Sequence, residues 1–459
     1  SRDAPDVSHG TTPTDATSDR MGRDGKVHRQ AADIVRRLRK AEQTKRGGSS
    51  VKGLTLAKQV SSKKATHAVT CEVLRYWDVL EEVAHEAALV VDGKTKRKEL
   101  VLVLVYELIL GKGLHPVGKE EKRVLERKAA IKAAFAKLLV RRKVDRPEML
   151  LSVSNRRQTK EWNRSARVNL LKLSVKDAIQ LLEKENMQVS IDPYLPDVLQ
   201  FPPGTDLHDH PLVADKRLIL QGWSSCIPAH ALSPPPGAKV IDACAAPGNK
   251  TTHLASLMKG TGMIFAFDRD LRRAGVLEEN LHKAGAQNYH VVCADFLTID
   301  PTAKEYAEVS CILLDPSCSG SGTTHSRMEH LLPSSQQNKG KAQSETDKHR
   351  VASLANFQEK ILLHALEFPG LERLVYSTCS VHVQENEQVV CKVLEKATSL
   401  GFGLGTPIPD WPYRGQDLGQ GGTPFIRVDS ERDGCDGFFV ALFERSHKPS
   451  LHQPGSHRP

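Results

Sequence analysis

Apolar residues between positions 51 and 144 recur every three or four residues, a spacing that predicts α-helices. Val73, Trp77, Leu80 and Ala84, for example, fall on one face of such a helix. The strongly apolar run at residues 100–110 contains Glu107 and is too short to cross a bilayer. We therefore predict a helical region over residues 51–150 and no association with a membrane.

A different pattern over residues 151–215 predicts a small α+β module. Within it, the pattern predicts a strand at residues 166–173, a helix at 175–186 and extended chain at 187–201. The two ends of the chain are polar, which predicts disordered tails. These tails cover residues 1–50, with room for one short helix at 31–43, and residues 447–459.

Between residues 216 and 446, short apolar runs alternate with helical stretches. The runs lie at residues 239–243, 263–268, 289–294, 310–314 and 373–377, and the helical stretches at 251–259, 270–284, 351–368 and 385–400. This alternation predicts an α/β fold with a Rossmann-like, doubly wound parallel sheet and helices on both faces. Two later runs, at residues 424–430 and 437–445, are predicted to be closing edge strands in antiparallel orientation. The polar insert at residues 323–350 is predicted to be mobile.

The chain has a net charge of +10 and a pI of about 9.1, which makes polyanions such as RNA its natural partners. Only 5% of its residues are aromatic, which argues against binding built mainly on base stacking. Basic clusters interrupt the helical region, and each suits either a solvated helix face or contact with RNA. They comprise Lys94, Lys96, Arg97, Lys98, Arg141, Arg142 and Lys143.

The nine cysteines form no C-x-x-C pair and match no zinc pattern, so no metal site is expected. Their odd number suggests free thiols in a reducing compartment, and we expect a soluble intracellular protein. A buried structural role is the preferred interpretation for Cys244, Cys293, Cys311 and Cys391.

Residues 244–252, CAAPGNKTT, follow the first predicted strand of the parallel sheet. Small residues and Gly248 let the backbone approach a ligand closely, and the next helix presents free amides to a carboxylate. The second and third strands end in Asp268 and Asp295, placed to bind ribose hydroxyls and an adenine edge. A nicotinamide dinucleotide would suit the same layout. However, G-x-G-x-x-G is absent and Pro247 occupies the tight turn, which favours S-adenosylmethionine.

The fourth strand ends in DPSCSGSG, which contains Asp315 and Cys318, and the fifth ends in VYSTCS, which contains Cys379. Neighbouring parallel strands bring the loops at their carboxyl ends together, so both thiols should line one cleft. Carbon 5 of cytosine is a poor nucleophile. A thiolate that adds to carbon 6 turns the ring into an enamine, and carbon 5 can then take a methyl group. Asp315 is placed to hold ring nitrogen 3, and Cys379 shortly precedes a helix whose amino end favours a thiolate.

Methylation of an exocyclic amine commonly uses the motif D/N-P-P-Y/F, whose aromatic residue stacks on the base. Here the corresponding residues are D-P-S-C, in which a potential nucleophile replaces the aromatic. The sequence therefore favours methylation at carbon.

These residues strongly resemble the Sun-domain family of RNA cytosine-5 methyltransferases, over about residues 165–445. The motifs that carry the resemblance are FPPGTDLHDHPL, LQGWSS, DACAAPGNKT, DPSCSGSG, LVYSTCSVHVQENE and DGFFVALFER. The motif sequence DPSCSGSG is similar to that of the subgroup that modifies large-subunit ribosomal RNA. The basic first fifty residues and the insert at 323–350 lie outside this shared core.

The resemblance implies that Cys379 is the nucleophile and that Cys318 assists release of the methylated product. It also implies that the α+β module binds RNA. The residues implied to hold S-adenosylmethionine are Cys244, Ala245, Ala246, Pro247, Gly248, Asn249, Lys250, Asp268, Asp295 and Asp315.

We expect a monomeric enzyme in the nucleus, at the nucleolus, that acts on large-subunit ribosomal RNA or pre-ribosomal particles. One alternative is a transfer RNA methyltransferase with the same chemistry. Another is a non-catalytic assembly factor that binds pre-ribosomal RNA, although an inert copy would have no need of both thiols.

Overall fold

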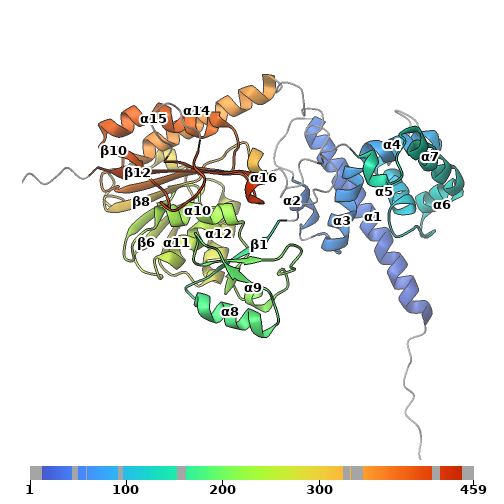
Figure 1. Cartoon of the computed structure of the whole chain (residues 1–459), viewed down its shortest axis with the longest axis horizontal. Helices are drawn as coiled ribbons and strands as arrows, with labels where there is room; N and C mark the ends of the chain where they lie inside the picture. The colour runs from blue at the N-terminus through green and yellow to red at the C-terminus, as the bar shows by residue number, and fades with distance from the viewer. Residues whose placement is uncertain are drawn as a thin grey trace, which may run out of the picture. The chain divides into compact units, whose positions relative to one another are not determined.

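The computed structural model describes residues 13–43, 50–57, 59–90, 97–151, 162–323, 331, 345–415 and 424–446 (Figure 1). The chain divides into two compact units. Ser1–Gln158 and Thr324–Ala342 form the first unit, and Thr159–Thr323 and Gln343–Pro459 form the second. No helix among these described ranges is long and apolar enough to cross a membrane.

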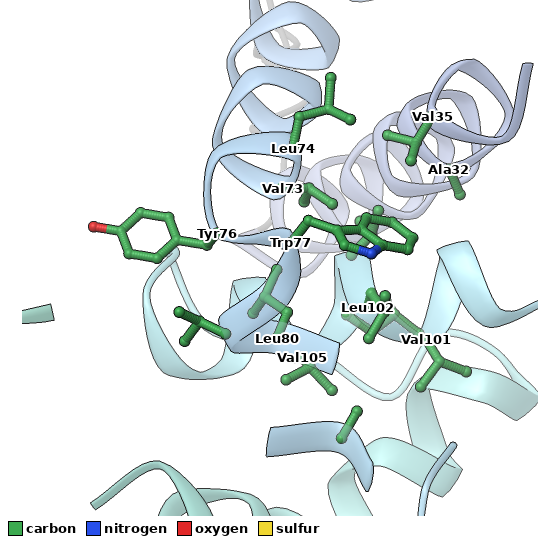
Figure 2. Close-up of a cluster of buried hydrophobic side chains, with 14 of the residues drawn as sticks. Ala32, Val35, Val73, Leu74, Tyr76, Trp77, Leu80, Val101, Leu102 and Val105 are labelled. Atoms are coloured by element: carbon green, nitrogen blue, oxygen red, sulfur yellow. The ribbon is translucent and has the colours of Figure 1, made fainter. Parts of the chain in front are cut away.

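The first unit is helical. Its helices are α1 (Pro13–Gln43), α2 (Val51–Thr55), α3 (Lys63–Arg75), α4 (Trp77–Glu86), α5 (Lys98–Ile109), α6 (Lys119–Glu126) and α7 (Lys128–Arg141). The apolar run of the sequence forms α5, whose side chains from Leu100 to Val105 are all buried. Figure 2 shows side chains of α1, α3 and α5 gathered around Trp77. Burial on all sides explains why α5 has almost no polar face.

The helix α1 corrects the predicted disordered tail over residues 1–50, because residues 13–43 form one helix. Its buried residues include Ala31, Ala32, Ile34, Val35 and Leu38, which recur at helical spacing. Charged residues between them lower the mean hydropathy of the segment and hide this narrow apolar stripe. The stripe packs into the same hydrophobic core as α3 and α5.

The second unit begins with a four-stranded antiparallel sheet in the order β2-β3-β1-β4. Its strands are β1 (Arg164–Val168), β2 (Ser190–Ile191), β3 (Val198–Phe201) and β4 (Leu218–Ile219). Helix α8 (Val175–Lys184) packs on this sheet through Ala178 and Leu182. Strand β4 pairs with β1, so this module extends beyond the boundary at residue 215 that the sequence predicts.

A larger sheet follows in the order β10-β12-β9-β8-β5-β6-β7, with β11 paired to β12. Its parallel strands are β5 (Lys239–Asp242), β6 (Met263–Phe267), β7 (Tyr289–Val292), β8 (Val309–Leu314) and β9 (Arg373–Thr378). Its remaining strands are β10 (Phe402–Gly405), β11 (Ile426–Val428) and β12 (Phe438–Arg445). The predicted α/β fold is thereby confirmed.

Helices cover both faces of this sheet (Figure 1). Those of one face are α10 (Trp223–Leu232), α11 (Asn249–Leu257) and α12 (Leu271–Ala284), and those of the other are α14 (Glu345–Ala365) and α15 (Glu387–Ser399). Successive strand residues point to opposite faces, so that Val240 belongs to one hydrophobic core and Ile241 to the other.

The prediction that residues 437–445 form an edge strand is wrong. Strand β12 lies between β9 and β10, antiparallel to both. The outer strand β10 reads FGLG and lacks the apolar run by which strands are recognised in a sequence. Most of the insert predicted to be mobile, at residues 323–350, lies outside the described residues.

Substitutions in the helical core test the packing of the first unit. Val101 is fully buried on α5, so Val101→Ala should lower the free energy of unfolding by about 1–3 kcal/mol. Val140 on α7 is 77% exposed, and Val140→Ala should change it by less than about 0.5 kcal/mol. Urea unfolding followed by circular dichroism measures both. Equal effects of the two substitutions would contradict this packing.

Candidate active site

The two cysteines predicted to share a cleft lie together where β8 and β9 end. Cys318 Sγ and Cys379 Sγ are 3.3 Å apart, too far for a disulfide bond, and both side chains are partly buried. The loops that carry them are joined by a hydrogen bond from Gly322 N to Cys379 O at 2.9 Å. A Cβ at Gly322 would lie 2.3 Å from Gly437 O, so only glycine allows this approach.

The buried carboxylate of Glu385 ties both cysteine loops to one point. One oxygen, Oε1, accepts hydrogen bonds from Ser319 N at 2.8 Å and from Gln358 Nε2 at 3.1 Å. The other, Oε2, accepts from Ser380 Oγ at 2.6 Å. Since Ser319 follows Cys318 and Ser380 follows Cys379, one side chain fixes the position of both thiols.

Asn386 adds a second brace around Cys379. Its Oδ1 accepts a hydrogen bond from Thr378 Oγ1 at 2.5 Å, and its Nδ2 donates to Ser380 O at 2.9 Å. Sequence reasoning missed the roles of Glu385 and Asn386. Their signal is present in the motif LVYSTCSVHVQENE, where they directly precede α15.

The predicted catalytic acid, Asp315, lies directly after β8 and is held on both sides. Its Oδ1 accepts from Ser377 Oγ at 2.8 Å, and its Oδ2 accepts from Lys250 Nζ at 2.7 Å. Burial lowers the pKa of Lys250, but the neighbouring Asp315 carboxylate raises it further, so the pKa ends above its ordinary value. Lys250 is therefore a stable cation, and its charge also attracts a thiolate at Cys379.

The two thiols differ in electrostatic environment. The hydrogen bond to Cys379, burial and the charge of Asp315 together raise the pKa of Cys318 well above its ordinary value. Cys318 therefore remains a neutral thiol when Cys379 ionises. Burial also raises the pKa of Cys244, which suits a packed thiol rather than a nucleophile.

The loop between β5 and α11 has the close turn predicted for a cofactor. Gly248 has a φ of 102°, and a Cβ there would lie 2.9 Å from Leu277 Cδ1. Pro247 O accepts a hydrogen bond from Asn280 Nδ2 at 2.8 Å, and Ala246 O accepts one from Arg273 Nη2 at 2.7 Å. The first turn of α11 begins directly after this loop and leaves amides for an anionic group.

Two further predicted acids end the neighbouring strands. Asp268 follows β6, is buried, and pairs with Arg273 Nη2 at 3.3 Å. Asp295 follows β7 and caps a short 3-10 turn by accepting a hydrogen bond from Leu297 N at 3.1 Å. Beside Asp268 and the loop lies a surface hollow of about 370 Å³. It is lined by Ala246, Pro247, Asp270, Arg272, Arg273 and Val276.

The structure corrects the cysteine assignments in part: Cys311 is buried as expected, but Cys244 and Cys391 are only partly buried. Cys293 was expected to be buried, but it is exposed, because it follows β7 at the edge of the sheet. Of the basic clusters, Lys98 pairs with Glu81, and both Arg141 and Arg142 pair with Glu82. Lys94 and Lys96 lie outside the described residues.

Comparison with known families matches the chain in three consecutive segments. Residues 64–151 match the N-terminal domain of NOL1/NOP2/Sun domain family member 5, and residues 162–221 match the ferredoxin-like domain of the same protein. Residues 229–444 match the family 16S rRNA methyltransferase RsmB/F.

Two solved structures resemble the whole fold. The crystal structure of PH0851 covers 92% of this chain and 98% of its own, with a TM-score of 0.63 and 21% identity. A methyltransferase homolog protein from Pyrococcus horikoshii matches over 80% of this chain and 99% of its own length, with a TM-score of 0.52 and 24% identity. At these identities the likeness concerns the fold alone.

Full-length relatives are closer in sequence. The 25S rRNA (cytosine-C(5))-methyltransferase NSUN5 of Arabidopsis thaliana is 44% identical over 423 residues, which cover 92% of this chain and 73% of the relative. A 28S rRNA (cytosine-C(5))-methyltransferase of Mus musculus is 41% identical over 417 residues, which cover 86% and 87%. The family resemblance of the sequence is confirmed: the chain belongs to the NOL1/NOP2/Sun domain family and has the domain series of family member 5.

Proposed function

We propose that this protein is an RNA (cytosine-5)-methyltransferase that methylates a cytosine of large-subunit ribosomal RNA with S-adenosylmethionine. The observation that carries the proposal is the pair of thiols 3.3 Å apart beside Asp315 and a charged Lys250. The relatives at 41% and 44% identity are named 28S and 25S rRNA (cytosine-C(5))-methyltransferases, which supports the choice of substrate.

The residues around the carboxyl ends of β5, β6 and β7 fit S-adenosylmethionine. The loop 244–250 and the first turn of α11 would hold its carboxylate, and the buried Asp268 its ribose hydroxyls. Asp295 would face the adenine. Asp315 is the last of the residues proposed to hold S-adenosylmethionine. S-adenosylmethionine supplies an electrophilic methyl group at this site.

The reaction begins at Cys379. Its thiolate adds to carbon 6 of the cytosine, a bond forms between sulfur and carbon, and electron density moves to carbon 5. Carbon 5 would then take the methyl group as the methyl–sulfonium bond breaks and S-adenosylhomocysteine leaves. The proton on carbon 5 would pass to solvent, the electrons of that bond would re-form the ring double bond, and Cys379 would leave as a thiolate. Asp315, with the Lys250 ammonium 2.7 Å away, is placed to hold ring nitrogen 3.

The surroundings of the two thiols support the roles that the family resemblance implies. Lys250 attracts the negative charge of a Cys379 thiolate, whereas the raised pKa of Cys318 keeps that residue protonated. These surroundings support Cys379 as the nucleophile and Cys318 as the residue that assists product release.

The basic chain, with a net charge of +10, suits a ribosomal RNA substrate in the nucleus, at the nucleolus, either free or within pre-ribosomal particles. We propose that the enzyme acts as a monomer. A transfer RNA substrate is not favoured, since the relatives at 41% and 44% identity are named for ribosomal RNA. A non-catalytic assembly factor would not require two thiols braced by one buried carboxylate.

The nucleophile assignment gives one prediction. Cys379→Ala should reduce methyl transfer at least about a thousandfold, because the thiolate that adds to carbon 6 is removed. Binding of S-adenosylmethionine, measured by calorimetry, should remain within about twofold of the unsubstituted protein. The exposed Cys293 gives the matched control, and Cys293→Ala should retain full transfer of labelled methyl to ribosomal RNA. Full activity of Cys379→Ala would refute the assignment.

The proposed role of Cys318 gives a second prediction. Without Cys318 to assist release, the methylated base should stay attached, so Cys318→Ala should accumulate RNA bound covalently to Cys379. A denaturing gel would show this species as a slowly migrating band. The double variant Cys318→Ala/Cys379→Ala should lose the band. A band that persists in the double variant would place the bond on a different residue.

A further inference from the structure

A buried ionic cluster lies between the small module and the helix that follows the cofactor loop. Arg167, on β1, is fully buried, which is rare for a charged side chain. Its Nε donates to Gln221 Oε1 at 3.2 Å, and its Nη2 donates to Thr252 Oγ1 at 3.0 Å and to Asn249 O at 3.4 Å. A side chain of the four-stranded sheet thus reaches the first turn of α11.

Asp197, the residue before β3, makes a second connection from the same module. Its Oδ1 accepts a hydrogen bond from His230 Nε2 on α10 at 2.6 Å, and its Oδ2 accepts one from His253 Nε2 on α11 at 3.0 Å. Burial raises the pKa of Asp197, but the two histidines lower it further, so the pKa ends well below its ordinary value. Asp197 is therefore ionised.

Arg167 and Asp197 supply opposite charges to the cluster. Burial and the nearby Arg167 lower the pKa of His253 to about 3, so this histidine is neutral at physiological pH and donates through Nε2. The Asp197 carboxylate then offsets the Arg167 guanidinium. Although Asp197, His230 and His253 could together face a metal ion, their direct contacts at 2.6 Å and 3.0 Å are ordinary hydrogen bonds.

The first turn of α11 is held from two sides. Its contacts with the module are made by Asn249 and Thr252, which bind Arg167, and by His253, which binds Asp197. The two residues between them turn to the catalytic sheet, where Lys250 Nζ donates to Asp315 at 2.7 Å and Thr251 Oγ1 to Asp242 at 2.8 Å. Movement of the module side of this turn would therefore displace Lys250.

We propose that Arg167 and Asp197 are positioning residues for S-adenosylmethionine: from the small module they fix the first turn of α11 and thereby set the affinity of the cofactor loop. This inference rests on the proposed function, and it gives the module a task besides RNA binding. Neither residue touches the reacting atoms. Both act through Asn249, Thr252 and His253.

Arg167→Met tests the proposal, because it keeps the length of the side chain and removes its hydrogen bonds. The dissociation constant for S-adenosylmethionine, measured by calorimetry without RNA, should rise about tenfold. KM for S-adenosylmethionine should rise similarly, while KM for RNA should stay within about twofold. Arg164→Met is the matched control, since Arg164 is exposed on the same strand, and it should leave S-adenosylmethionine binding unchanged.

A pair of variants at Thr252 keeps the test independent of folding defects in Arg167→Met. Thr252→Val removes the acceptor of the Arg167 bond and should weaken S-adenosylmethionine binding, whereas Thr252→Ser keeps the acceptor and should bind normally. The proposal is overturned if Thr252→Val and Thr252→Ser bind equally well. It is also overturned if Arg167→Met melts at a lower temperature but binds with unchanged affinity. An unsubstituted protein that binds no S-adenosylmethionine would instead contradict the proposed function, and the inference with it.

Discussion

The parallel pairing of β8 with β9 is the constraint on which the site depends. It sets Leu314 beside Tyr376, so that the chain leaves both strands at the same edge and the residues that follow must meet. Cys318 and Cys379 are 61 residues apart in sequence, yet their sulfur atoms lie at 3.3 Å. The sheet brings the two cysteine loops together, and the hydrogen bonds of Glu385 and Asn386 then fix their local conformation.

Much of this arrangement could be predicted, because it depends on features that leave a strong pattern in sequence. Alternating apolar runs and helical stretches define the parallel sheet, and function-bearing residues of such a sheet follow its strands. The structure places the candidate residues Cys318, Cys379, Asp315 and Asp268 after strands β8, β9 and β6, as this pattern predicts. That strands β8 and β9 are neighbours is also predicted from the sequence and is confirmed.

The features that sequence reasoning missed depend on contacts between distant segments. The long helix α1 is polar in composition, and its apolar stripe has meaning only when a partner core is present. Strand β10 is recognisable as a strand only by its pairing with β12. Glu385 appears as one of several acids near a helix start, and its bonds to both cysteine loops require three-dimensional coordinates.

The crossing of backbones at Gly322 has a consequence for how the thiol pair tolerates change. Main chain meets main chain there, with Gly437 on one side and the Cys379 carbonyl on the other, and no side chain lies between them. Peptide groups cannot shorten or change rotamer, so the spacing of the two loops that carry the thiols is inherited from polypeptide geometry. Substitutions in the surrounding loops can therefore alter their polarity while the backbones that carry the two cysteines keep their spacing.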